Sequence, residues 1–100
     1  MHINKYSFIG RFSMLIIWTR HSRERFFERL LIYGINLGEI EQNVLKQKVK
    51  QKQKEGTIKT VFKVLDCYFT VIKKETRKCI SIISIWEANQ EEVMLWGKRM

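Results

Sequence analysis

Residues 57–85, TIKTVFKVLDCYFTVIKKETRKCISIISI, decide the fold of this chain. From 57 to 65 the side chains alternate between an apolar or threonine face and a face that carries lysines. This period of two is typical of a β-strand. Two more strands are predicted over residues 68–73 and 78–85, and we expect a turn at 74–77 to join them as a hairpin.

Upstream of this segment, residues 14–18 (MLIIW) form a short, apolar, β-branched run that predicts a buried strand. Residues 1–13 show no clean periodicity, and we expect either an N-terminal arm or an extra strand there. Residues 14–100 then make a single basic domain, because a chain of 100 residues has room for one hydrophobic core.

Two helices are predicted between these strand regions. Thr19 is placed to cap a helix over residues 20–33, and Gly34 suits its C-terminal end. Asn36 is placed to cap a second helix over residues 37–48, whose acidic first turns and basic last turn suit the helix dipole. The expected inward side chains are Phe26, Phe27, Leu30 and Leu31 in the first helix, and Leu37, Ile40, Val44 and Leu45 in the second.

A third helix is expected over residues 87–98, with Ala88, Val93, Leu95 and Trp96 against the sheet. The predicted order of elements is therefore β-α-α-β-β-β-α. Two helices followed by a meander of strands favour an α+β fold, with an antiparallel sheet and the helices packed on one side of it.

The charge balance narrows the class of partner. Nineteen lysines and arginines against ten acidic residues give a formal net charge of +9. Such a surplus attracts phosphate backbones, anionic membranes or acidic proteins, and RNA is the leading candidate. The alternative is a generically basic protein with no such partner.

No membrane segment is predicted, because the longest apolar run, at residues 14–18, is far too short to span a bilayer. No small-residue cleavage site follows that run, and Arg20 and His21 come at once, so a signal peptide is not expected. These features favour a cytoplasmic protein.

The cysteines and histidines offer no metal site. On the predicted register Cys67 faces Ser84, whereas Cys79 lies on the opposite side of the sheet, so a disulfide between the cysteines is not expected. We interpret both as small buried residues in a reducing compartment. His2 and His21 add no ligand spacing, and no metal or other cofactor is expected.

The most distinctive stretch, HSRERFFER, begins at His21. His21, Arg25 and Arg29 lie four residues apart, so they follow one side of the first predicted helix. An imidazole that moves a proton, beside guanidiniums that stabilise a pentacovalent phosphate, suits phosphodiester cleavage. Alternatively, Glu24 and Glu28 pair with the arginines and make this an ordinary solvated face.

Further basic residues are interpreted as contacts that grip a phosphate backbone without reading its sequence. A lysine stands at every second position in Lys46, Lys48, Lys50, Lys52 and Lys54. These lysines would line one edge of an extended segment but spread around a helix. Lys59 on the outer face of the first meander strand, and Arg77 at the hairpin tip, add charge. Three aromatic residues are candidates either for base stacking or for the core, namely Tyr68, Trp86 and Trp96.

Two segments resemble known families. The pattern His-x-x-Glu-Arg-x-x-Glu-Arg from His21, followed by Gly34-Ile35 and an acidic-apolar helix, resembles the small DUF4258-type domains. The sequence ISIISIWEANQEE at 80–92 resembles the last strand and helix of BrnT-type toxins, and both groups are placed near the RelE-like toxin ribonucleases. The chain departs from the first pattern by four extra residues before Gly34, and from the second by Ile85-Trp86 where an arginine is common.

The resemblance implies a RelE/BrnT-like toxin of a toxin–antitoxin pair, acting as a metal-independent endoribonuclease. The ribose 2′-OH would attack the phosphate and leave a 2′,3′-cyclic phosphate end. We expect His21 to transfer the proton and Arg25 and Arg29 to clamp the phosphate, with Lys63 in the same catalytic set. The implied partners are RNA and an acidic antitoxin. Two alternatives stay open: a non-catalytic nucleic-acid-binding module, and a basic protein-interaction domain.

Overall fold

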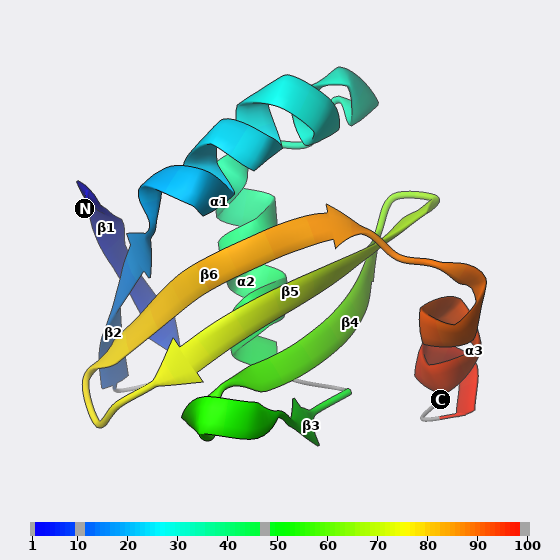
Figure 1. Ribbon diagram of the computed structural model, residues 1–100. Coiled ribbons are helices and arrows are strands. Elements are labelled where there is room, and N and C mark those ends of the chain that lie inside the picture. The colour runs from blue at the N-terminus through cyan, green and yellow to red at the C-terminus, as the bar shows by residue number, and fades with distance from the viewer. Residues whose placement is uncertain (1, 10–11, 47–48, 99–100) are drawn as a thin grey trace.

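One six-stranded sheet organises the molecule, and the computed structural model describes residues 2–9, 12–46 and 49–98 (Figure 1). The strands lie in the order β1-β2-β6-β5-β4-β3. Their bounds are β1 (His2–Ile9), β2 (Phe12–Trp18), β3 (Gln51–Lys52), β4 (Ile58–Val64), β5 (Cys67–Glu75) and β6 (Cys79–Glu87). The helical segments are α1 (Arg20–Arg25), the π-helical turn η1 (Phe26–Leu30), the 3₁₀ turns η2 (Leu31–Tyr33) and η3 (Lys54–Gly56), α2 (Leu37–Lys46) and α3 (Gln90–Lys98).

The sheet is mixed. β2 and β6 run parallel, with Leu15 paired to Cys79 and Trp18 to Ile82, whereas every other neighbouring pair of described strands is antiparallel. The α+β class is confirmed, but the expectation of a purely antiparallel sheet is wrong. β6 completes the hairpin with β5 and then uses its free edge to pair with β2, a strand from the other end of the chain. The local hairpin pattern carries no information about that second neighbour.

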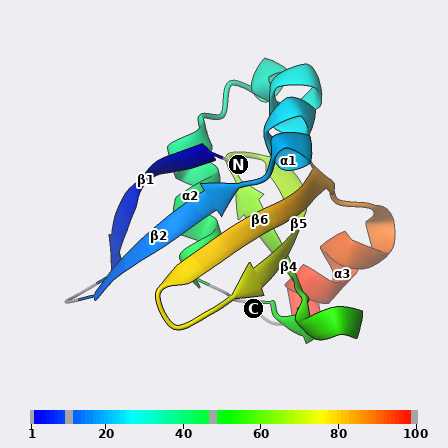
Figure 2. The same ribbon diagram turned by 60° about the vertical axis from the view of Figure 1, so that its left-hand side comes forward.

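The helices cover both faces of the sheet, so the prediction that they pack on one side is wrong (Figure 2). Phe62 and Val64 of β4 join the core on the face covered by α2. Lys59, on the other face of β4, forms an ion pair with Glu92 of α3. The alternation expected for this strand is thus correct. The lysine-bearing face of β4 also contains Val61, which is fully buried. This face is covered by α3.

The β5–β6 hairpin is longer than predicted, and its turn comes later. Glu75 still pairs with Ile80, and the backbone N–H of Thr76 donates to the carbonyl of Cys79 at 2.8 Å. Ser84 consequently lies opposite Ile72 and not opposite Cys67, which pairs with Val64 of β4. Both cysteines are free and half-buried. The extra length of β5 has a physical reason, because Glu75 is held in the strand by an ion pair with Lys73.

The helix caps lie where the sequence predicts them. The Thr19 hydroxyl accepts the N–H of Ser22, and Gly34 ends the 20–33 run in a left-handed conformation with φ 76°. Asn36 and Glu39 form a reciprocal capping box at the start of α2. The predicted extension of α2 to residues 47–48 lies outside the described residues.

The third helix starts later than predicted, at Gln90. Asn89 and Glu92 make a second capping box there, each accepting the backbone N–H of the other. Glu87 still belongs to β6, where it pairs with Phe69. The expected helix start at 87 is therefore wrong by three residues.

Only one line of the first helical run is buried, so part of the predicted apolar stripe is wrong. Phe26 and Leu30 lie in the core, and Phe26 meets the ring of Trp18 edge-on at 5.8 Å. Phe27 and Leu31 are about half exposed. The run packs on β6 and β2, which offer surface only to the side chains directly beneath it.

Candidate nucleic-acid interface

The first turn of α1 is held by hydrogen bonds to a β-bulge in β6. Ile72 pairs with Ser84 but Lys73 pairs with Ile82, which leaves Ile83 as the extra residue. The carbonyl of Ile82 accepts the backbone N–H of Thr19 at 3.1 Å and the hydroxyl of the buried Ser22 at 2.8 Å. The carbonyl of Ile83 accepts the Thr19 hydroxyl at 3.2 Å. These hydrogen bonds hold α1, where the candidate site begins, against β6.

We call His21, Arg25 and Arg29 the cationic row. His21 and Arg29 are exposed and Arg25 is half-buried. Among the described residues, none of the three makes a side-chain hydrogen bond or an ion pair. The row is therefore available to a ligand.

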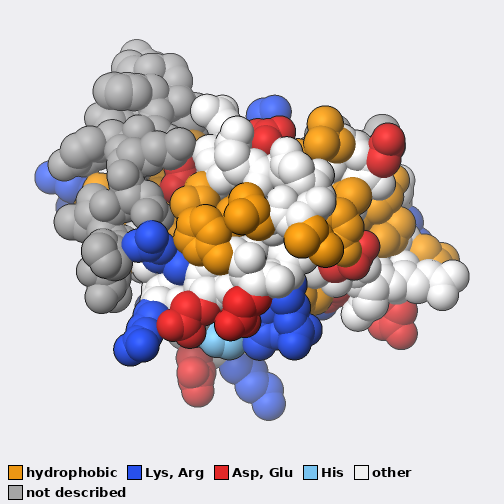
Figure 3. Space-filling view, turned by 90° about the horizontal axis from the view of Figure 1, so that it is seen from above, with side chains coloured by type: hydrophobic (Ala, Val, Ile, Leu, Met, Phe, Trp, Pro, Cys, Tyr) orange, Lys and Arg blue, Asp and Glu red, His pale blue; other side chains and the backbone are white. Residues whose placement is uncertain are grey.

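Among the described residues, the neighbouring acids form no ion pair with the row. Glu24 pairs with Arg20, at 3.0 Å, and not with Arg25. Glu28 is exposed and forms no ion pair with another described residue. Figure 3 shows the imidazole on one edge of the surface, with basic and acidic side chains around it and apolar side chains beside them. The alternative in which these acids pair with the arginines of the row is not what the structure shows.

Lys63, predicted as a fourth catalytic residue, does not lie with the row. It projects from β4, with its Nζ 5.5 Å from the centre of the Tyr68 ring. α1 packs on β6, and β5 separates β6 from β4, which places Lys63 roughly 10 Å further across the sheet. A joint catalytic role for His21 and Lys63 has no geometric support.

The described members of the alternating lysines lie in different elements. Lys46 is in the last turn of α2, Lys52 is in β3 and Lys54 is in η3. Lys50 approaches Glu75 at 3.7 Å. Lys48 lies outside the described residues.

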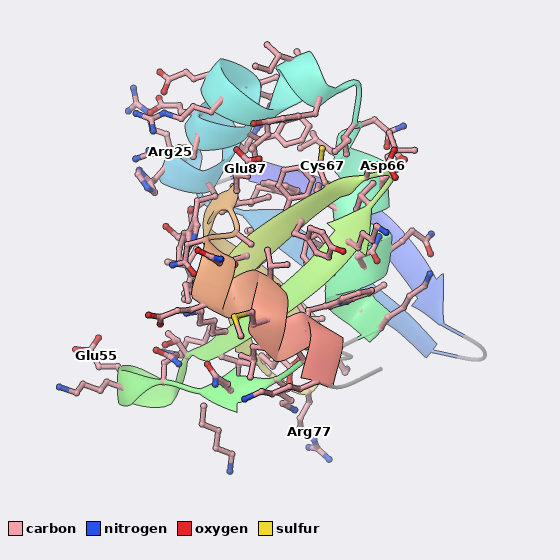
Figure 4. The ribbon with its side chains drawn as sticks, turned by 90° about the vertical axis from the view of Figure 1, so that its right-hand side faces the viewer. Arg25, Glu55, Asp66, Cys67, Arg77 and Glu87 are labelled. Carbon is pink, nitrogen blue, oxygen red and sulfur yellow. The ribbon has the colours of Figure 1, made fainter. Side chains whose placement is uncertain are left out.

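Arg77 marks a second basic end of the molecule. It is exposed in the β5–β6 turn, and Figure 4 shows Arg25 and Arg77 at opposite ends. Figure 1 places η3, which carries Lys54, at the same end as that turn. The predicted nucleic-acid contacts thus divide between two surfaces.

Lys59, also predicted to bind phosphate, is engaged within the protein. Its Nζ lies 2.6 Å from Oε2 of Glu92, whose Oε1 accepts the indole N–H of Trp86 at 3.0 Å. Burial acts to raise the pKa of the Glu92 carboxyl. The hydrogen bonds from Lys59, the Asn89 backbone and Trp86 outweigh burial and hold that pKa below its ordinary value. Lys59 and Glu92 therefore form an internal ion pair that joins α3 to the sheet.

The aromatic candidates for base stacking pack internally as well. The rings of Tyr68 and Trp96 meet edge-on at 5.3 Å, and the Trp86 indole donates to Glu92. All three are half-buried between the sheet and α3. They stabilise the attachment of α3.

Sequence inspection missed a completely buried lysine. Lys73 donates to the carbonyl of Val44 at 3.0 Å and to Glu75 at 2.7 Å. Burial lowers its pKa, and the neighbouring Glu75 carboxylate only partly offsets this effect. The available signal was its position two residues after Val71, on the apolar face of β5. Because the lysine satisfies a carbonyl near the end of α2, its role is structural.

Comparison of the chain with family models, curated proteins and solved structures finds no match. Within the described residues, no group of three or more His, Cys, Asp or Glu side chains is placed to hold a metal ion. No described helix is long and apolar enough to cross a membrane. The cationic row is consequently the feature that points to a function.

Proposed function

We propose that the protein binds RNA through the cationic row, and that His21 is the proton-transfer group of a metal-independent endoribonuclease. The observation that carries the proposal is the availability of the row: the imidazole and the Arg25 guanidinium on α1, and the Arg29 guanidinium on the following turn η1, have no partner among the described residues. A phosphodiester offers the negative charge that these groups lack.

Each residue of the row has a role in this chemistry. The His21 imidazole takes the proton from the ribose 2′-OH as the oxygen attacks phosphorus. Arg25 and Arg29 stabilise the extra negative charge of the pentacovalent phosphate. The bond to the 5′ oxygen then breaks, that oxygen takes up a proton, and the products are a 2′,3′-cyclic phosphate and a free 5′-OH.

The resemblance to BrnT-type toxins extends the proposal to a toxin held by an acidic antitoxin. The surplus of nineteen basic over ten acidic residues favours a partner of opposite charge. An antitoxin that covers the cationic row would compete directly with RNA.

A non-catalytic RNA-binding role is the second candidate, and one observation favours it. Two surface pockets of the described residues are lined from β3, β4, α2, α3 and the loop before α3, and neither includes a residue of the row. His21 and Arg29 are exposed, which suits phosphate binding without enclosure of a reacting group.

Induced expression separates these candidates. Wild type, His21→Ala, Arg25→Ala and the control Arg20→Ala are compared for growth and for integrity of cellular RNA. Arg20 belongs to the same helix but already pairs with Glu24. Cleavage predicts that His21→Ala and Arg25→Ala both abolish growth inhibition and RNA breakdown, while Arg20→Ala retains them. If His21→Ala behaves as wild type, the nuclease proposal is wrong. If Arg25→Ala also does, RNA binding at the row is wrong too.

A further inference from the structure

Most of the exposed large apolar side chains of the described residues lie at one end of the molecule. Three of them, Phe27, Leu31 and Ile32, belong to the single helical run of η1 and η2, and we call these three the apolar strip. Ile32 is 82% exposed, which leaves most of its side chain in water. An exposed apolar surface bordered by polar residues is typical of a site that binds another molecule.

A fourth exposed apolar side chain, that of Leu65, occupies the turn between β4 and β5. Figures 1 and 4 place this turn at the same end as η2, and the Tyr33 ring of η2 meets the Phe69 ring of β5 at 5.7 Å. Leu65 has a left-handed backbone with φ 57° and is 64% exposed. A bulky side chain is strained in that conformation, and its exposure gives no burial in return. Strain of this kind is concentrated at functional sites, which favours a binding role for Leu65.

The charges beside the strip favour an acidic partner. Arg20 and Glu24 pair with each other. Of the other arginines and glutamates on residues 20–33, three arginines and one glutamate form no ion pair with a described residue, namely Arg23, Arg25, Arg29 and Glu28. Figure 3, which looks onto this end, shows apolar side chains in the middle of the face and most charged side chains towards its border. An apolar centre with a charged rim is the usual anatomy of a protein–protein interface.

The same charges distinguish between possible occupants. A second copy of the chain would bring its own net charge of +9 against this rim, which is repulsive. A segment rich in aspartate and glutamate instead places carboxylates opposite the unpaired guanidiniums, and such charge-assisted pairs are strong. Because the strip lies on a helical run, whose backbone groups bond mainly within the run, it offers little to an extended segment. A helix satisfies its own backbone and needs only side-chain contacts.

We propose that the apolar strip and the arginines beside it bind an acidic amphipathic helix of a partner protein. The apolar side of that helix packs on the strip and reaches Leu65, and carboxylates on its flanks pair with Arg25 and Arg29. Phe27 and Leu31 lie four residues apart, the spacing at which one helix packs against another. The inference shares Arg25 and Arg29 with the proposed RNA site but does not require RNA cleavage, since it depends on the strip.

The test is an NMR titration of the ¹⁵N-labelled full chain with a blocked 18-residue peptide that carries leucines along one helical face and glutamate or alanine elsewhere. Binding should shift the amide signals of residues 27–32 and of Leu65. Two further peptides should each bind at least about tenfold more weakly: one with lysine in place of glutamate, and one scrambled so that the leucines share no face. Equal binding of all three peptides, or shifts confined to α3, would overturn the proposal.

Three variants locate the contact. Ile32→Ser should weaken the acidic peptide by about tenfold, because the interface loses a buried apolar side chain. Met94→Ser, a similar change at an exposed position of α3, should leave the affinity within about twofold. Leu65→Asn should weaken the peptide without lowering the thermal midpoint, because asparagine adopts the left-handed conformation more readily. Equal affinities for wild type, Ile32→Ser and Met94→Ser would contradict the proposal.

Two measurements separate the proposal from its rivals. Sedimentation of the free chain tests self-association, and a dimer that Ile32→Ser dissociates would assign the strip to a second copy and overturn the proposal. His21→Ala should remove the RNA cleavage proposed above and leave the peptide affinity within about twofold. Peptide binding without RNA cleavage by the wild type would refute the proposed nuclease alone, whereas cleavage without peptide binding would refute this inference alone.

Discussion

Glu92 shows how one residue joins two layers of the molecule. Only 4% of its surface is exposed, yet its carboxylate meets Lys59, the Trp86 indole and the Asn89 backbone N–H. A buried charge is tolerated only when it is paired and hydrogen-bonded, and Glu92 satisfies both conditions. Its contribution should therefore appear in the stability of the whole fold.

Glu92→Gln tests this contribution, because the amide retains the shape of the carboxyl but not its charge. We expect the free energy of unfolding at neutral pH to fall by about 1–3 kcal/mol, since Lys59 loses its counter-charge. Urea denaturation measures the change. Glu91→Gln, at the exposed neighbouring position, should cost less than about 0.5 kcal/mol. Equal losses for the two variants would contradict the account.

The pH dependence of stability should depend on the same carboxyl. Its folded-state pKa lies below the ordinary value of 4.5, so its stabilisation is complete at neutral pH. That stabilisation is lost as the pH falls below 4.5 through the folded pKa. The stability difference between wild type and Glu92→Gln should therefore shrink in acid. A difference that stays constant from neutral pH into this range would exclude the linkage.

At the scale of elements, the attachment of α1 is local and specific. Thr19 and Ser22 bond to the bulge in β6, and the cationic row runs from α1 into the π-helical turn η1, which carries Arg29. Beyond α1 the helical run continues through η1 and η2, where Phe27 and Leu31 are about half exposed. α1 should consequently unfold locally more readily than α2 when its hydrogen bonds to β6 are weakened.

Ser22→Ala removes the hydroxyl that donates to the Ile82 carbonyl. We expect a loss of about 1 kcal/mol, and native-state hydrogen exchange should become faster in α1 than in α2. Ser81→Ala, also on β6 but without a side-chain bond to another described residue, is the control. Uniform acceleration across both helices would show that Ser22 acts on the fold as a whole and not on α1.

The elements differ in how far sequence predicts them, for physical reasons. Caps at Thr19, Gly34 and Asn36 were predictable because each involves residues no more than four apart. The hairpin register was not, because Lys73 and Glu75 extend β5 through a buried contact with α2. The parallel pairing of β2 with β6 is non-local, and no periodicity within either strand encodes it.

The candidate site divides in the same way. Exposure of the row followed from helical spacing, since Phe26 and Leu30 occupy the buried side. The roles of Lys59 and Lys63 were not predictable, because the alternation of β4 does not reveal that α3 covers its lysine face. Whether a lysine meets solvent or a buried carboxylate depends on a helix from the other end of the chain.

At the scale of the whole molecule, positive charge gathers at two opposite ends. The α1 end carries the cationic row, and the other end carries Lys54 and Arg77. Positive charge at either end attracts a polyanion at long range. Among the described side chains, only the α1 end combines guanidiniums with an imidazole, so we expect the direct phosphate contacts at that end.

The measurement that tests this assignment most directly is the affinity for a short labelled single-stranded RNA over a series of salt concentrations. Arg25→Gln/Arg29→Gln is compared with Lys54→Gln/Arg77→Gln, which removes the same charge from the opposite end. Each phosphate contact to a single strand contributes about 0.7 to the slope of log affinity against log salt. The account predicts that the α1 double variant loses about 1.4 of this slope and most of the affinity. An equal or larger loss in the Lys54/Arg77 variant would contradict it.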